Sequence, residues 1–149
     1  MQEASTFTPI KINYESLPGD PSTKWPLVEV KLSTQATKIR QSLYALVDSG
    51  SNVSIIHPFT ASMLGFTKKD LKMQPGGRSV SGVYKSALSP VEVVTNIYGY
   101  TFQLTYTVVD NPNLAFACIL GQDSIFQWAR LDFQRFKGIF EIKFRKDLH

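Results

Sequence analysis

The residue best placed to do chemistry is Asp48, which stands in the run Ala45-Leu46-Val47-Asp48-Ser49-Gly50. Apolar runs at 43–47 and 53–56 flank it, so we expect a carboxylate at the mouth of a buried strand. Partial removal from water lets neighbouring groups set the proton affinity of a carboxylate, as general acid–base catalysis requires. Gly50 permits a turn that brings the carboxylate against main-chain N–H groups. The alternative is an ordinary surface turn, which the tripeptide Asp-Ser-Gly alone favours.

Other catalytic arrangements are incomplete in this sequence. His57, His149 and Cys118 do not have the spacing of a zinc site, so we expect no metal and no other cofactor. Cys118 lies in an apolar run and is predicted to be an inert core thiol. His57 precedes a proline, which favours a place at the start of a helix over a role as ligand or base. The segment 77–82 differs by one residue from a nucleophile elbow.

Composition indicates one ordinary globular domain. The chain has 149 residues, of which 43% are hydrophobic and 19% charged, and its one cysteine excludes an intrachain disulfide. No apolar run approaches the ~20 residues of a membrane span. Residues 1–9 lack the pattern of a signal peptide, so a cytoplasmic location is the default expectation. The net charge is +4. Part of the positive charge lies in the C-terminal segment, which we interpret as the solvated face of a hairpin in preference to a nucleic-acid-binding tail.

Strand signals dominate the chain. Short β-branched or aromatic runs, separated by turn residues, predict strands at 6–12, 25–32, 42–47, 53–56, 91–97, 100–109 and 116–120. Proline and glycine positions predict short helices at 59–64 and 122–129. Exposed hairpins are predicted at 76–86 and 131–144. The fold class that follows is all-β with one or two short helices.

The order of these segments resembles that of the retroviral-type, or retropepsin-like, aspartic proteases. That family has an apolar strand, Asp-Thr/Ser-Gly, an apolar pair and a short helix, then a glycine-bearing flap hairpin and an apolar-apolar-Gly signature before another helix. The chain matches these features, in order, at 46–51, 54–56, 77–83 and 119–123. The resemblance implies a closed, mostly antiparallel β-barrel in a single domain. Its parts would be an N-terminal extension (1–24), a core (25–133), and a closing strand and tail (134–149).

The resemblance also implies roles for individual residues. The catalytic residue would be Asp48, in an active-site loop completed by Ser49, Gly50 and Ser51. The substrate-binding flap would contain Ser81, Gly82 and Val83. A strand beside the active-site loop would contain Ile119, Leu120 and Gly121. A Ser51 hydroxyl that donates to the Asp48 carboxylate would stabilise its charged form and lower the pH optimum relative to an alanine version.

Aspartic proteolysis needs two carboxylates that share a proton around one water. The sequence has a single Asp-Ser-Gly, so the second Asp48 would come from another copy, in a homodimer that cleaves peptides or proteins. The Ser49 side chains would bond across the two subunits, and the two carboxylates would titrate as a unit. The termini are longer than in viral members, so the dimer interface would be built differently. The alternative is a non-catalytic binding or dimerisation module of the same fold within a larger protein.

Overall fold

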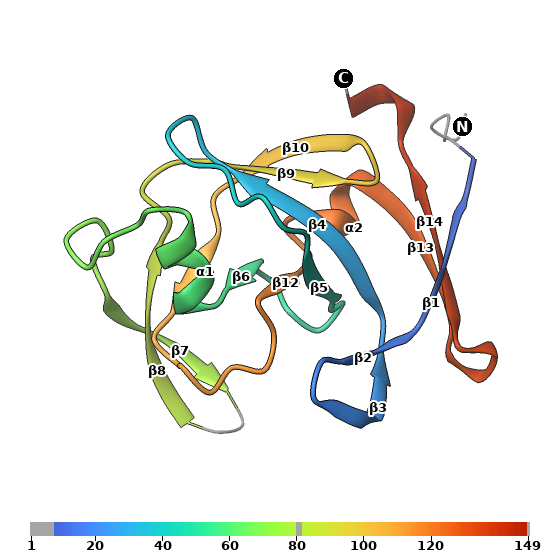
Figure 1. Ribbon diagram of the computed structural model, residues 1–149, viewed down its shortest axis with the longest axis horizontal. Coiled ribbons are helices and arrows are strands. Elements are labelled where there is room, and N and C mark those ends of the chain that lie inside the picture. Colours follow the sequence, from blue (N-terminus) through green and yellow to red (C-terminus); the bar gives the residue numbers. More distant parts are fainter. Residues whose placement is uncertain (1–7, 80–81, 149) are drawn as a thin grey trace.

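The computed structural model describes residues 8–79 and 82–148, and these are mostly β with few short helices (Figure 1). The strands are β1 (Ile10–Asn13), β2 (Glu15–Leu17), β3 (Asp20–Trp25), β4 (Leu27–Ser33), β5 (Leu43–Val47), β6 (Ile55–Ile56), β7 (Gln74–Ser79), β8 (Gly82–Leu88), β9 (Val93–Ile97), β10 (Tyr100–Leu104), β11 (Thr107–Val109), β12 (Cys118–Leu120), β13 (Ala129–Gln134) and β14 (Ile139–Phe144). The helices are α1 (Pro58–Met63) and α2 (Ile125–Trp128), and the 3-10 turns are η1 (Arg135–Lys137) and η2 (Lys146–Leu148).

The main sheet has a parallel centre within an otherwise antiparallel arrangement. Its strand order is β10-β9-β4-β5-β12-β6-β11-β8-β7. β12 runs parallel to β5 and antiparallel to β6, and β6 in turn runs parallel to β11. Parallel neighbours require a long connection, so this centre joins segments that are far apart in the chain. It places the carboxyl end of β5 directly beside that of β12.

The expected closed barrel is not found among the described residues. β10 and β7 are the two ends of the strand order, and each pairs only with its own hairpin partner, β9 and β8. The run 100–109, predicted as one strand, is also broken. Its first half pairs with β9 and its second half with β6 and β8. The break falls where the backbone N–H of buried Tyr106 donates to the Ser89 hydroxyl, at 3.1 Å, instead of to a strand neighbour.

The first helix lies where the sequence predicts it, shifted by one residue toward the N-terminus at each end. His57 is its N-cap: its Nδ1 accepts from the N–H of Phe59 at 2.9 Å. The imidazole proton therefore sits on Nε2, which lies 3.1 Å from the carbonyl oxygen of Pro112. Gly65, with φ of +85°, follows the helix in the left-handed conformation that favours glycine. The predicted place of His57 at a helix start is confirmed.

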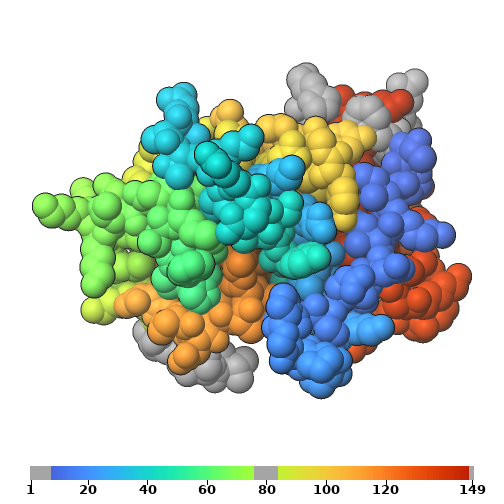
Figure 2. Space-filling view, viewed as in Figure 1, coloured from blue at the N-terminus to red at the C-terminus, as the bar shows by residue number. Residues whose placement is uncertain are grey.

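The two ends of the chain meet in a second, smaller sheet. β14 lies between β1 and β13 and is antiparallel to both. Figure 2 shows the N-terminal segment lying against the C-terminal strands along one side of the molecule. Along the chain, a β2–β3 hairpin that the sequence patterns did not predict lies between β1 and β4. The strands β1, β13 and β14 thus cover the same side of the molecule.

The sheet separates two apolar clusters of different size. The larger is the main core and includes Ala45 and Val47 of β5 with Cys118 and Leu120 of β12. The smaller contains Leu46 and Ile119, whose side chains point the opposite way, together with Leu27. Because strand side chains alternate between faces, Asp48 belongs to the same face as Leu46. The smaller cluster therefore lies on the face of the sheet to which Asp48 belongs.

Candidate active site

Asp48 directly follows β5 and is held through its main chain and its side chain. Its N–H donates to the carbonyl of Leu120 at 3.0 Å, which extends the β5–β12 pairing by one bond. Its carbonyl accepts from the N–H of Ser51 at 3.2 Å. Its Oδ1 accepts from the N–H of Gly50 at 2.9 Å, and the residue is half-buried. The carboxylate thus rests against a main-chain donor in a tight turn, as the sequence predicts.

The residue after β12 lies close against the loop that carries Asp48. A Cβ added to Gly121 would lie 2.5 Å from the carbonyl oxygen of Ser51 and 2.6 Å from that of Val53. Only a residue without a side chain fits at such a distance. The N–H of Gln122 donates to the same Ser51 carbonyl at 2.8 Å. Gly121 and Gln122, directly after Ile119 and Leu120 of β12, therefore lie against the loop that carries Asp48.

A buried hydroxyl network ties the same two segments together, and sequence analysis missed it. The Ser54 hydroxyl accepts from the N–H of Gly121 at 3.0 Å and lies 2.6 Å from both Asp123 Oδ1 and Ser124 Oγ. A carboxylate only accepts, so the single Ser54 proton goes to Asp123. The Ser124 hydroxyl also lies 3.2 Å from the carbonyl of Gly121. The one sign of this network in the sequence was a serine inside the apolar run 53–56, because a buried polar group needs hydrogen-bond partners.

Ser54→Ala is expected to lower the free energy of unfolding by about 2 kcal/mol, because it leaves the buried N–H of Gly121 without an acceptor. Urea unfolding of the variant and the parent chain measures the difference. Ser62→Ala, on the exposed side of α1, is the matched control and should stay within about 0.5 kcal/mol of the parent. Equal stabilities for the two variants would contradict a structural role for the Ser54 network.

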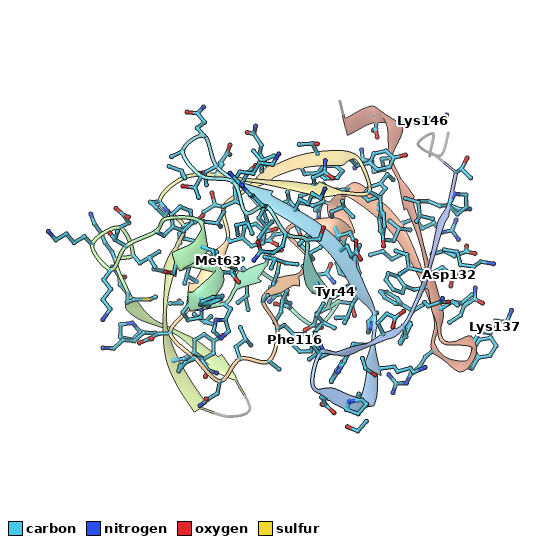
Figure 3. The ribbon with its side chains drawn as sticks, viewed as in Figure 1. Tyr44, Met63, Phe116, Asp132, Lys137 and Lys146 are labelled. Carbon is cyan, nitrogen blue, oxygen red and sulfur yellow. The ribbon has the colours of Figure 1, made fainter. Side chains whose placement is uncertain are left out.

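The smaller apolar cluster lies on the same face of the sheet as Asp48. Ile119 and Leu46 are directly opposite each other in the β5–β12 pairing, and both are nearly buried. Phe116, labelled in Figure 3, packs edge-on against Trp25 with ring centroids 5.2 Å apart, and both rings pack on the cluster. Trp25 Nε1 is buried and has no hydrogen-bond partner among the described residues.

The other predicted loop and flap residues are placed as follows. Ser49 is exposed. The Ser51 hydroxyl donates to the carbonyl of Val53 at 2.7 Å, so the expectation that it donates to Asp48 is wrong. The nearby main-chain carbonyl takes the only proton that the hydroxyl has. Gly82 and Val83 begin β8 of the β7–β8 hairpin, and Ser81 lies outside the described residues.

The remaining chemically active side chains do not join this site. Cys118 is fully buried, and burial raises the pKa of its thiol to about 12. Tyr106, also buried, shares a 2.8 Å hydrogen bond with Thr95, and burial raises the pKa of its phenol well above the usual value. A thiol in such a place is not a nucleophile at neutral pH. Across residues 8–79 and 82–148, no cluster of His, Cys, Asp or Glu could hold a metal ion, and no helix is long and apolar enough to cross a membrane.

Comparison with solved structures identifies the architecture. A retropepsin-like aspartic protease from Rickettsia conorii superposes with a TM-score of 0.63 at 15% identity, covering 91% of this chain and 98% of that one. The chain has the retropepsin-like fold. The retroviral protease-like domain of Ddi1 from Leishmania major gives a TM-score of 0.51 at 20% identity, covering 70% of this chain and 79% of that one.

The EIAV protease, in complex with the inhibitor HBY-793, gives a TM-score of 0.50 at 20% identity, covering 71% of this chain and 89% of that one. No protein-family model matches the sequence, and no curated protein gives a significant match. At these sequence identities the comparisons show the retropepsin-like fold alone. The activity has to be argued from the residues of this chain.

Proposed function

We propose that the chain is an aspartic endopeptidase that acts as a homodimer, with Asp48 of each copy at the shared site. The observation that carries the proposal is the half-buried Asp48 carboxylate, which accepts from the N–H of Gly50 in a turn held by β12. A carboxylate fixed in this way at the end of a strand, in a retropepsin-like fold, is positioned for acid–base work on a water molecule.

The chemistry requires a second carboxylate, and the sequence supplies only one Asp-Ser-Gly. Two copies related by a two-fold axis would bring the two Asp48 side chains together around one water. The ionised carboxylate takes a proton from this water as it attacks the scissile carbonyl carbon, while the protonated carboxyl donates a hydrogen bond to the carbonyl oxygen. The exposed position of Ser49 leaves its side chain free to meet the partner subunit.

The surroundings of Asp48 favour an extended peptide as substrate. Leu46 and Ile119 lie on its face of the sheet and, with Trp25 and Phe116 packed on them, would supply an apolar floor beneath the peptide. In the view of Figure 1 the β7–β8 hairpin and the β2–β3 hairpin extend on either side of the β5–β6 connection. Closure of the β7–β8 hairpin as a flap would exclude water and bond the peptide backbone.

A cleavage assay with an unfolded protein substrate tests the proposal. We expect cleavage at acidic or neutral pH that a pepstatin-type inhibitor blocks, because such inhibitors imitate the tetrahedral species between two aspartates. Specific activity should rise with protein concentration in step with the dimer fraction measured by sedimentation. A chain that remains monomeric at every concentration, or that cleaves nothing at any pH, would instead favour a non-catalytic module of the same fold.

A further inference from the structure

The side chain of Gln122, in the turn after β12, reaches the loop that carries Asp48. Its Nε2 lies 2.7 Å from the main-chain carbonyl oxygen of Ser49. A carbonyl oxygen only accepts, so the amide nitrogen of the glutamine must face it as donor. Ser49 itself is exposed, yet its carbonyl is bound by a residue 73 positions further along the chain.

Gln122 is itself held firmly on both sides of its backbone. Its N–H donates to the carbonyl of Ser51 at 2.8 Å. Its carbonyl accepts from Nε2 of Gln127, in α2, at 3.1 Å. The residue before it, Gly121, is pressed against the Ser51 and Val53 carbonyls and cannot shift toward them. A side chain that starts from so fixed a backbone needs little further ordering to hold its acceptor.

The bound carbonyl belongs to the peptide group that contacts the carboxylate. The carbonyl of Ser49 and the N–H of Gly50 form one planar peptide unit, and this N–H donates to Asp48 Oδ1 at 2.9 Å. In a planar trans peptide the carbonyl and the N–H point in opposite directions, so fixing one fixes the other. Hydrogen bonds aligned through one peptide group also polarise each other, which strengthens the bond to the carboxylate.

We propose that Gln122 is a positioning residue for Asp48, acting through the Ser49–Gly50 peptide group. The glutamine amide orients this peptide, and the peptide N–H orients the carboxylate. Gln122 does not touch the substrate in this assignment. The kinetic consequence rests on the proposed protease function, whereas the structural consequence, a firmly held Gly50 N–H, does not.

Two substitutions at position 122 separate donation from packing. Gln122→Met keeps an unbranched side chain of similar length but removes the donor, and Gln122→Arg restores N–H donors. Gln134→Met is the matched control, because Gln134 bonds Asp132 in β13, away from the Asp48 loop. Hydrogen exchange and the NMR shift of the Gly50 amide, together with kcat and KM, are measured for all variants and the parent chain.

In Gln122→Met we expect Gly50 amide exchange to accelerate about tenfold and kcat to fall about tenfold, with KM and the dimer fraction unchanged. Gln122→Arg should recover most of both changes, and Gln134→Met should show neither. An unaltered Gly50 amide in Gln122→Met overturns the proposal, even if the parent chain cleaves nothing. Equal losses in the Met and Arg variants also overturn it, since that pattern indicates packing alone. If the parent chain cleaves nothing but Gly50 amide exchange accelerates in Gln122→Met as expected, only the proposed protease function is contradicted.

Discussion

Asp48→Asn is expected to reduce peptide cleavage about a thousandfold or more while leaving the fold intact. The amide oxygen of asparagine still accepts from the N–H of Gly50, so the turn keeps its hydrogen bond. The amide cannot take the proton of the attacking water, and this removes the general base from both subunits at once. Initial rates on a peptide substrate measure the loss of cleavage. Circular dichroism and thermal unfolding measure whether the fold stays intact.

The same variant tests whether the site is shared between copies. When equal amounts of parent and Asp48→Asn chains are allowed to exchange, only about a quarter of the dimers carry two aspartates. Activity should therefore fall to about a quarter of the parent value at the same total concentration, instead of the half expected from independent monomers. Asp132→Asn, on β13 and labelled in Figure 3, is the control and should leave the activity of the mixture unchanged. A residual activity of one half would argue against the shared site.

Gly121→Ala is expected to destabilise the chain by about 3 kcal/mol or more, a large effect for one methyl group. The added Cβ would lie 2.5 and 2.6 Å from the carbonyl oxygens of Ser51 and Val53, and both are main-chain atoms of the Asp48 loop. Neither can rotate away as a side chain would, so the loop or β12 must shift. Cleavage should be lost along with stability, because the Asp48 turn depends on this contact.

Chemical unfolding measures the free energy of unfolding of Gly121→Ala, and Gly19→Ala is the control. Gly19 has φ of +83° and nothing within 4 Å of an added Cβ, so its substitution costs only the left-handed backbone, about 1 kcal/mol. The prediction would be wrong if the two variants unfolded at the same denaturant concentration. A parent-like pattern of amide resonances for residues 48–54 in Gly121→Ala would also count against it.

Local patterns in the sequence were enough to predict the Asp48 turn and the first helix. Asp48 stands between two apolar runs, and Gly50 permits the turn that brings a main-chain N–H to the carboxylate. Proline after His57 and a glycine at 65 define the ends of α1. Each of these features depends on residues within a few positions of one another, which is where sequence patterns are most informative.

Contacts between distant segments were beyond the same reasoning. The role of Gln122 depends on an acceptor 73 positions earlier, and the network of Ser54 depends on partners 69 and 70 positions later. The Ser51 expectation failed because the competing acceptor, a main-chain carbonyl, carries no signature in the sequence. The β2–β3 hairpin was missed because its strands are short and polar, and they gain their order from packing Leu17 and Trp25 on the smaller cluster.

The parallel pairing of β5 with β12 also sets a time order for the appearance of the site. The loop carrying Asp48 is made early, but its supports at Gly121 and Gln122 are synthesised some 70 residues later. Closing so long a loop is a slow and late step compared with forming hairpins. A growing chain that has not yet produced β12 has the aspartate but lacks the framework that holds it. The order of synthesis thus delays the fixing of the Asp48 turn until β12 and the residues directly after it have emerged.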